Sequence, residues 1–555
     1  MAELFRQLPP AAFVSTPLTC SRGWTRGMPP PPSVGALLFA SYKTYIGTPW
    51  ERPSSTKHRL LTGSFSKNFF KRKFLLRTSL KASAVPIEEN ALFEEANTPS
   101  VPTESEDATV REYVSALEES GEPHVAIVQS DSQVLDNGLG KSNSKSRREL
   151  FLRDSGSTTV AVHGGEQKRQ GKKARAILDA ITMPIVQSST FTFRSSSDCI
   201  AYNQGQYDSF EYGRYGNPTT RAAEEKIMML EEAEDALLSA SGMNSVTTML
   251  LALLSPNECL VTTRDCYRRT RQFLQTILPR MNIQTIVVDP ADTASVEAAL
   301  KRGARLFFSE MPTNPLIRVI DAESIIQLCR RYGTICCIDS TFATAYNLKP
   351  LCMGADLVLH SGTKYLGGHN DLMCGVLAGK KEFLEKIRSL HGILGGVVDP
   401  HSSYLLLRGM KTLPLRMRAH NENAAALAQV LSQHPKIAKV HYPSLSSHPD
   451  YSVAKTQFKN GFGGVLSFEI RGDPFGMETF AAGIRFVDGL SIPHIGPSLG
   501  GVESLVEQVC VMGYFDQPQR VRRELGITNG LIRFSCGVED KTDLLNDVLQ
   551  ALEAV

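Results

Sequence analysis

The sequence predicts an α/β enzyme whose mostly parallel sheet lies between helices, with a smaller α+β domain at the carboxyl end. From about residue 157 onward, helical stretches alternate with short apolar segments, a pattern typical of parallel strands connected by helices. Hydrophobic residues make up 42% and charged residues 21% of the chain, as expected for a globular enzyme. Polar residues follow several of the apolar segments, and strand ends are where α/β proteins bind ligands.

The predicted strands of the sheet are short and apolar. In chain order they are Ala236–Leu238, Cys259–Thr262, Gln284–Val288, Arg305–Ser309, Thr334–Ile338 and Asp356–His360. The apolar stretch Val246–Leu254 predicts a helix after the first of them. In the C-terminal domain, Gly464–Glu469 predicts a strand and Lys541–Leu552 predicts a helix.

The N-terminal segment differs in charge from the rest of the chain. Residues 1–81 contain 13 Lys and Arg but only Glu3 and Glu51 as acids, whereas the remainder is more acidic than basic. This composition predicts a transit peptide over residues 1–82 that directs the protein to the chloroplast stroma, with a mitochondrial address and a disordered regulatory tail as alternatives. Residues 83–156, first acidic and then polar, predict a disordered linker. Neither a nucleic-acid surface nor a membrane span is expected.

The eleven cysteines are scattered, with no Cys-x-x-Cys pair and no metal-ligand spacing. We therefore expect reduced thiols, no disulfide framework and no bound metal. Cys336 and Cys337 lie in a predicted buried strand, where they would serve as small apolar side chains.

Lys364 is the most informative residue of the chain. It lies in Ser361-Gly362-Thr363-Lys364, directly after the strand predicted at 356–360. An amine at a strand end can form an imine with an aldehyde cofactor, and the neighbouring hydroxyls of Ser361 and Thr363 can hold a phosphate. For this motif alone, a surface lysine is the alternative.

Asp339 follows another predicted strand, in Asp339-Ser340-Thr341-Phe342. A carboxylate at a buried strand end needs a cation as its partner, and a protonated ring nitrogen is one such cation. A helix N-cap aspartate is the alternative for this motif alone.

Two further motifs suit a planar, phosphorylated cofactor. Gly242 and Met243 follow the first predicted strand and open a helix, where backbone amides point toward an anion. The Gly-Lys-Ser/Thr sequence of a nucleotide-binding P-loop is missing here, and an ordinary helix start is the alternative. Tyr267 follows the predicted strand at 259–262 and can stack on a planar ring.

These motifs occur together, in a definite order. The series is Glu211-Tyr212-Gly213-Arg214-Tyr215-Gly216-Asn217-Pro218-Thr219, Ser241-Gly242-Met243, Asp265-Cys266-Tyr267, Pro312-Thr313-Asn314-Pro315, Asp339-x-Thr341-Phe342-Ala343, Ser361-x-Thr363-Lys364, Arg408-Gly409-x-Lys411-Thr412-Leu413, Ser498-Leu499-Gly500-Gly501-Val502-Glu503-Ser504 and Arg533-Phe534-Ser535-x-Gly537-x-Glu539-Asp540. In them the chain resembles the Cys/Met-metabolism family of fold type I pyridoxal-phosphate enzymes, from about residue 157 to residue 555.

The resemblance implies a seven-stranded, mostly parallel sheet and pyridoxal 5'-phosphate as cofactor. It also implies an N-terminal arm at 157–220 that contributes to the neighbouring subunit's active site, a large cofactor-binding domain at 221–400 and an α+β domain at 401–555. Members of the family usually assemble as homotetramers, built as dimers of dimers with shared active sites.

The resemblance further assigns roles to individual residues. Lys364 matches the lysine that binds the cofactor, Asp339 the partner of the ring nitrogen and Tyr267 the residue stacked on the ring. The remaining cofactor contacts that it implies are Gly242, Met243, Ser361 and Thr363 at the phosphate, Thr341 beside Asp339, and Tyr212 and Arg214 reaching from the neighbouring subunit. For the substrate, it implies Arg533 as the arginine that binds the α-carboxylate, with Ser498 and Asn314 nearby.

Two departures from the bacterial pattern bear on the substrate. Many bacterial relatives have two glycines after the stacking tyrosine, where this chain has Arg268 and Arg269, and a glutamate where it has Pro497. Added cations and a lost anion favour an anionic leaving group. We therefore expect γ-replacement of the phosphate of O-phospho-L-homoserine by L-cysteine to give L-cystathionine, the committed step of methionine biosynthesis, with Arg269 binding the substrate phosphate. The alternative for Arg268 and Arg269 is that both are solvated or paired with acidic side chains.

Three alternatives are open at this point. A γ-lyase acting on cystathionine or methionine, and an enzyme that adds sulfide directly to an acylhomoserine, would use the same cofactor and lysine. A non-catalytic pyridoxal-phosphate-binding protein is a remote third possibility, because such a protein needs neither Tyr267 nor Arg533.

Overall fold

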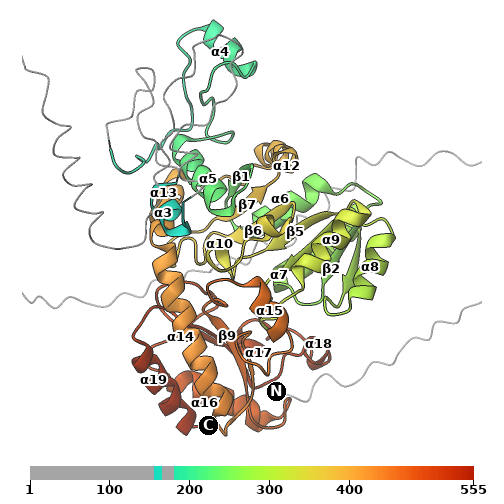
Figure 1. The fold of residues 1–555 in the computed structure, drawn as a ribbon, viewed down its shortest axis with the longest axis vertical. Helices are drawn as coiled ribbons and strands as arrows, with labels where there is room; N and C mark the ends of the chain where they lie inside the picture. Colours follow the sequence, from blue (N-terminus) through green and yellow to red (C-terminus); the bar gives the residue numbers. More distant parts are fainter. Residues whose placement is uncertain (1–154, 165–179) are drawn as a thin grey trace, which may run out of the picture. The chain divides into compact units, whose positions relative to one another are not determined.

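The computed structural model describes residues 155–164 and 180–555 (Figure 1). The predicted transit peptide at 1–82, and nearly all of the linker predicted at 83–156, lie outside the described residues. Within the described ranges, no helix combines the length and the apolar content that crossing a membrane requires.

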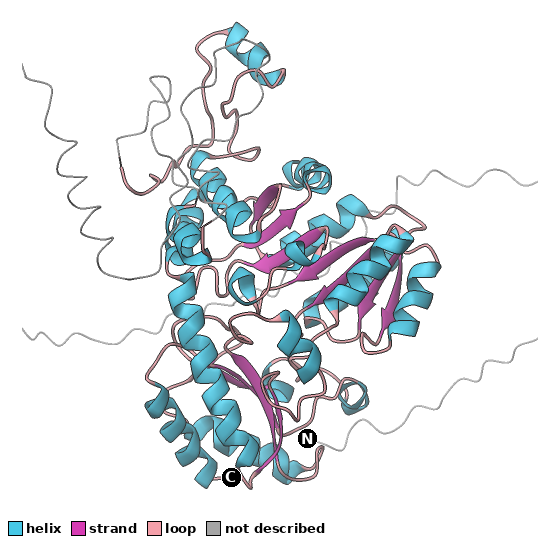
Figure 2. Ribbon diagram, in the orientation of Figure 1, coloured by secondary structure: helices cyan, strands magenta, loops and turns pink. Residues whose placement is uncertain are grey.

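The larger of the two sheets has seven strands in the order β1-β7-β6-β5-β4-β2-β3 (Figures 1 and 2). Its strands are β1 (Asp235–Ser239), β2 (Cys259–Thr263), β3 (Gln284–Val288), β4 (Leu306–Glu310), β5 (Ile335–Asp339), β6 (Leu357–Ser361) and β7 (Gly375–Gly379). Strands β2 to β6 pair in parallel, whereas β7 runs antiparallel to both β6 and β1. The predicted mostly parallel, seven-stranded sheet is confirmed.

Helices cover both faces of this sheet because alternate strand residues are apolar on each side. Leu306 and Phe308 of β4 join one buried cluster, whereas Phe307 between them joins another on the opposite face. The first cluster includes side chains of α6 (Gly242–Leu253), α7 (Arg268–Thr276) and α12 (Lys381–Leu394), and the second those of α8 (Thr293–Lys301) and α9 (Ala322–Tyr332). Shorter connecting helices are η1 (Leu278–Met281), α10 (Thr344–Asn347) and α11 (Pro350–Met353).

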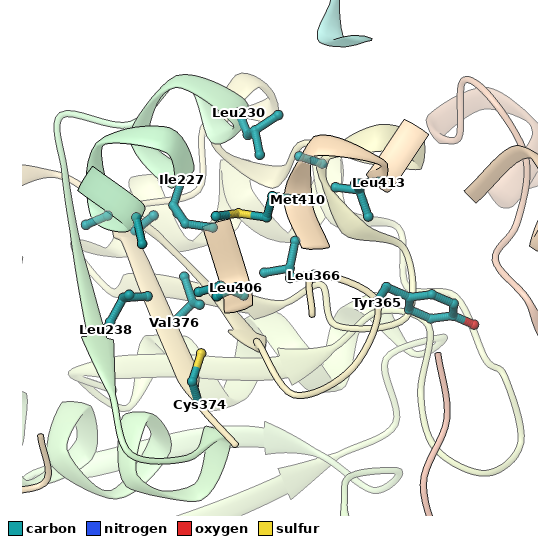
Figure 3. Close-up of a cluster of buried hydrophobic side chains, with 14 of the residues drawn as sticks. Ile227, Leu230, Leu238, Tyr365, Leu366, Cys374, Val376, Leu406, Met410 and Leu413 are labelled. Carbon is teal, nitrogen blue, oxygen red and sulfur yellow. The ribbon is translucent and has the colours of Figure 1, made fainter. Parts of the chain in front are cut away.

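A third buried cluster packs two helices against the β1 end of the sheet (Figure 3). Ile227 comes from α5 (Pro218–Glu231) and Met410 from α13 (Pro400–Lys411), and both lie with Val376 of β7 in this cluster. Tyr365 lies at its edge, and its hydroxyl accepts a hydrogen bond from the Gly464 amide at 3.1 Å. The residue that follows Lys364 is therefore fixed by packing on one side and by a hydrogen bond to the C-terminal part on the other.

The C-terminal part contains a second sheet, in the order β10-β11-β12-β9-β8. Its strands are β8 (Ile437–His441), β9 (Val465–Ile470), β10 (His494–Ile495), β11 (Leu505–Gln508) and β12 (Leu531–Ser535). Its helices are α14 (Leu413–Gln433), α15 (Tyr451–Gln457), α16 (Met477–Gly489), α17 (Val509–Met512), α18 (Gln519–Glu524) and α19 (Lys541–Glu553). The long helix α14 contacts this sheet and also α3 (Ser157–His163).

Sequence and structure differ mainly at element ends. Strands β4, β5 and β6 each end one residue later than predicted, so Asp339 and Ser361 are the last residues of their strands. Helix α6 begins at Gly242 instead of residue 246, because the side chain of Ser241 caps it by accepting from the Asn244 amide. The domain boundaries at 220 and 400 stay predictions, since α5 crosses the first and α13 contacts elements on both sides of the second.

Candidate functional site

A cavity of about 430 Å³ lies where strands of the large sheet meet the C-terminal part. It gathers the ends of β4, β5 and β6, the starts of α6 and α7, and residues of the second domain. Its lining comprises Ser241, Gly242, Met243, Val246, Tyr267, Thr270, Glu310, Pro312, Asn314, Asp339, Thr341, Phe342, Leu359, Ser361, Thr363, Lys364, Met373, Pro497, Leu499 and Arg533. Most residues that the sequence singled out are therefore brought together here.

Lys364 enters the cavity from the turn after β6. Its Nζ donates a hydrogen bond to the Ser498 hydroxyl at 2.6 Å, so the amine is held between the two domains. Burial and the nearby Arg533 cation together lower the pKa of Lys364 to about 8, and Glu507 opposes the shift. About a tenth of this amine is therefore neutral at about pH 7, and the neutral form is the one that acts as a nucleophile or base.

Asp339 presents a partly buried carboxylate at the end of β5. Its Oδ1 accepts hydrogen bonds from the Thr341 amide at 2.9 Å and from the Thr341 hydroxyl at 2.5 Å. The same hydroxyl oxygen accepts from the Ser361 amide at 2.8 Å, which links the ends of β5 and β6. Burial raises the pKa of Asp339, while Thr341 and the more distant His360 counteract the shift.

Glu310 is a second buried carboxylate, and the sequence analysis did not single it out. Burial and the negative charge of Asp339 together raise its pKa to about 8. The carboxylate accepts a hydrogen bond from the Tyr267 amide, so it fixes the backbone of that residue at the start of α7. Because Glu310 ends β4, the strand-end argument that selected Asp339 could have found it as well.

The predicted phosphate contacts lie where β1, β6 and β7 meet. Gly375 of β7 is the partner of Ser239 on one side and of Ser361 on the other. A Cβ on Gly242 would lie 3.1 Å from Cβ of Ser361, so the start of α6 and the end of β6 approach closely because residue 242 has no side chain. Thr363 is held by Cys374, whose amide donates to the threonine hydroxyl at 3.0 Å.

Arg533 lies on β12 and reaches the cavity from the second domain. Its Nη1 donates to Oδ1 of Asn314 at 3.1 Å, and Nη2 donates to the carbonyl oxygens of Pro497 and Ser498, each at 3.1 Å. Glu507 forms an ion pair with it, Nη1 to Oε1 at 3.2 Å. Glu507 was also missed, because a single acidic residue in a short apolar strand gives no sequence signal.

Two predicted contacts lie elsewhere in the chain. Tyr212 forms an isolated bridge with Thr190, and the Arg214 guanidinium donates to the Gly392 carbonyl at 2.5 Å and lies over the Tyr215 ring. Arg214 lines a separate cavity of about 550 Å³. The structure therefore does not bring Tyr212 or Arg214 to Lys364 of the same chain, and their role toward a neighbouring subunit stays a prediction.

Arg269 also lies outside the lining of the Lys364 cavity. It is exposed on α7 and donates to the side-chain oxygen of Gln272 at 2.8 Å. Arg268 instead pairs with the carboxylate of Asp516 and donates to the Gly513 carbonyl at 2.8 Å. Contact between Arg269 and a substrate phosphate stays a prediction.

The residues of the cavity fit pyridoxal phosphate. Asp339 and Glu310 bring two carboxyl groups with raised pKa values into the cavity, and the negative charge of Asp339 contributes to the raised pKa of Glu310. A protonated ring nitrogen would offset this negative charge. The start of α6 and the hydroxyls beside it offer donors for a phosphate, with room that depends on Gly242. Lys364 supplies a buried amine with a lowered pKa, suited to an aldehyde.

Comparisons with known proteins agree with this chemistry. The family described as "Cys/Met metabolism PLP-dependent enzyme" matches residues 158–553. Cystathionine gamma-synthase 1, chloroplastic, of Nicotiana tabacum is 48% identical over 432 residues, covering 78% of this chain and 78% of that protein.

Solved structures extend the similarity to two kinds of enzyme. Cystathionine gamma synthase from Xanthomonas oryzae pv. oryzae, in complex with aminoacrylate and cysteine, is 33% identical with a TM-score of 0.66, covering 72% of this chain and 98% of that one. Cystathionine gamma-lyase from Lactobacillus plantarum, complexed with L-serine, is 36% identical with a TM-score of 0.66, covering 72% and 99%. Because the two TM-scores are equal, the fold alone does not separate a synthase from a lyase.

Proposed function

Because the chain belongs to the Cys/Met metabolism family of pyridoxal-phosphate-dependent enzymes, we propose that it is a cystathionine-forming enzyme that replaces the phosphate of O-phospho-L-homoserine with L-cysteine. The observation that carries the proposal is the convergence of Lys364, Asp339 and Arg533 on one cavity, in a chain 48% identical to a chloroplastic cystathionine gamma-synthase. An amine, an anion and a guanidinium are the three groups that an amino-acid substrate and this cofactor require together.

Each of these residues has a distinct task. Pyridoxal phosphate, when bound, supplies an aldehyde that condenses with amines and a ring that takes up the electron pair of a deprotonated carbon. Lys364 would take the proton from the substrate Cα at its neutral Nζ and return a proton later. Asp339 would hold the proton on the ring nitrogen, and Arg533 would orient the substrate through its α-carboxylate.

The preference for a phosphate ester rests on α7. Arg268 is neutralised by Asp516, whereas Arg269 donates to the uncharged side chain of Gln272. Arg269 therefore keeps its charge for an incoming anion, and this difference supports Arg269 over Arg268 as the phosphate contact. The phosphate would leave as a dianion, so a cation beside it stabilises the charge that develops.

Assembly and location complete the proposal. The positions of Tyr212 and Arg214, away from the Lys364 cavity of their own chain, support a dimer whose arms complete each other's sites. Two such dimers would form a homotetramer. The basic N-terminal segment and the chloroplastic name of the Nicotiana tabacum relative support a plastid location.

The proposed function is tested with the full chain loaded with pyridoxal phosphate. Cystathionine formation from L-cysteine is compared for O-phospho-, O-succinyl- and O-acetylhomoserine, and 2-oxobutanoate and homocysteine are assayed alongside. We expect cystathionine with a clear preference for the phosphate ester. Dominant 2-oxobutanoate from cystathionine would make the enzyme a γ-lyase, and homocysteine from sulfide would make it a sulfhydrylase. Cofactor binding without turnover would leave only a binding protein.

The ester preference is tested separately with Arg269→Gly. Loss of a charge-assisted contact of about 1.5–3 kcal/mol should raise KM for O-phosphohomoserine by at least about tenfold and leave KM for O-succinylhomoserine nearly unchanged. Arg268→Gly is the matched control and should have the smaller effect, because Asp516 already neutralises Arg268. Equal changes for both esters would rule out the phosphate contact.

A further inference from the structure

The carboxylate of Glu507 lies beside Arg533, the arginine that the C-terminal domain contributes to the cavity. Glu507 of β11 and Arg533 of β12 are partners in the antiparallel ladder, so their side chains leave the sheet side by side. The Nη1 to Oε1 distance is 3.2 Å, and the side chains are only 5% and 6% exposed. Burying two charges this deeply costs free energy of desolvation, which their mutual attraction must offset.

The orientation of the guanidinium does not depend on Glu507 alone. Asn314 and the carbonyl oxygens of Pro497 and Ser498 already accept hydrogen bonds from Nη1 and Nη2 of Arg533. These acceptors are uncharged, so they fix direction without neutralising the cation. What Glu507 adds is its negative charge.

That charge reaches a second cation. Lys364 donates to the hydroxyl of Ser498, whose carbonyl accepts from Arg533, so the amine and the guanidinium are held by the same residue. Arg533 disfavours the protonated amine, and Glu507 favours it. Conversely, burial raises the pKa of Glu507, and Arg533 and Lys364 are the two cations that oppose this shift and favour its charged form.

We propose that Glu507 is a positioning residue that acts as the counter-ion of both Arg533 and Lys364 and so sets how readily Lys364 gives up its proton. The inference rests on the proposed role of Lys364 as the residue that captures the cofactor, and it goes beyond the proposed function because it assigns a task to a residue that touches neither substrate nor cofactor. It predicts opposite effects for the two members of one ion pair.

The test measures the proton affinity of Lys364 without catalytic turnover. Cofactor-free full-length protein is mixed with pyridoxal phosphate, and the rate of capture is followed through the cofactor absorbance across a series of pH values. Only the neutral amine attacks the aldehyde, so the midpoint of the pH profile reports Lys364. Glu507→Gln should lower this midpoint by about one pH unit, because a negative charge that favours the protonated amine has been removed. Arg533→Gln should raise it.

Glu524→Gln is the matched control. Glu524 is an exposed carboxylate of the C-terminal domain that pairs with Arg520 on α18, so its loss should leave the midpoint unchanged. An unchanged midpoint in Glu507→Gln, or a shift of the same sign in Arg533→Gln, would overturn the inference. If Glu507→Gln does not fold, the double variant is compared with Arg533→Gln: a lower midpoint in the double variant supports the inference, and an equal or higher one overturns it.

These outcomes are independent of the substrate. A protein that makes no cystathionine but shows the opposite shifts would keep the inference and lose the proposed function. If the protein makes cystathionine but all variants have the same midpoint, the proposed function stands and the inference about Glu507 falls.

Discussion

The cavity around Lys364 and the arm that carries Tyr212 differ in how their residues are held. Lys364 and Asp339 are fixed by strand ends and by a network of hydrogen bonds through Thr341 and Ser498. Over residues 180–217 the described chain contains α4 (Ser196–Asn203) and one isolated bridge, and apolar side chains such as Ile181 are 86% exposed. These exposed apolar side chains support the proposal that another subunit covers the arm. The cavity is organised within one chain, whereas the arm is proposed to act by association with a second subunit.

The largest effect is expected at the centre of the cavity. Lys364→Ala should lower cystathionine formation by at least about 10³-fold, since it removes both the cofactor-binding amine and the base. Borohydride treatment should no longer attach the cofactor covalently. Lys381→Ala, which changes a 67% exposed side chain on α12, is the control and should stay close to wild type. A Lys364→Ala enzyme that kept a tenth of its activity would place the chemistry elsewhere.

The next largest effect is expected at Asp339. Asp339→Asn keeps the shape but removes the charge that holds the ring nitrogen protonated, so kcat should fall by about 10²-fold while the cofactor still binds. Asp292→Asn is the comparison, because Asp292 is an N-cap, the alternative role considered for Asp339. Equal, small losses in both variants would reduce Asp339 to a structural cap.

A smaller effect, visible only in an assembly, is expected on the arm. Arg214→Ala should weaken cofactor binding by about tenfold, as expected for one charge-assisted hydrogen bond. Mixed with Lys364→Ala protein, it should regain activity above either variant alone, because a hybrid dimer contains one intact site. Arg520→Ala, which changes an 82% exposed side chain of the C-terminal domain, is the control and should alter nothing. Without recovery in the hybrids, the arm would not serve a neighbouring site.

The smallest effect is expected in the pH dependence of the reaction, which should depend on Lys364 in the cavity and not on Arg214 in the arm. Phosphate release from O-phosphohomoserine is measured without cysteine, so that the thiol of the second substrate does not contribute. With a pKa of about 8 for Lys364, kcat, which reports the substrate-bound enzyme in which this amine is free, should increase as pH rises through that value and the amine loses its proton, by roughly tenfold between about pH 7 and about pH 9. Arg214→Ala should lower the whole profile without moving its midpoint. A profile that falls with pH would contradict the neutral-lysine argument.

The sequence predicted individual strands and the residues at their ends better than it predicted which strands pair with one another. Gln284–Val288 was predicted with its observed bounds, and Asp339 and Lys364 were found because each lies at the end of a strongly apolar run. Strand β7 was missed, since its sequence Gly375–Gly379 is short and glycine-rich, and its antiparallel insertion is a property of the assembled sheet.

Glu507 shows the same limit for the site. Its importance comes only from its position opposite Arg533, a residue 26 positions further along the chain, and no local pattern records that register. Arg269 shows the opposite case: the sequence marks it clearly, but a single chain leaves it exposed to solvent. Contacts that depend on pairing register or on a second subunit are therefore beyond what one sequence, read locally, can predict.

The position of β7 between β1 and β6 has a consequence for how the protein folds during synthesis. Gly375 pairs with Ser239 at the end of the first strand of the large sheet and with Ser361 at the end of the sixth, and it belongs to the last strand of that sheet to be synthesised. The two halves of the predicted phosphate-binding region therefore come together only after a closure that spans well over a hundred residues, which is a slow, long-range step in folding. A nascent chain that lacks β7 contains Lys364, but its predicted phosphate contacts are not yet assembled. Pyridoxal phosphate is therefore expected to bind fully only after β7 has joined the sheet.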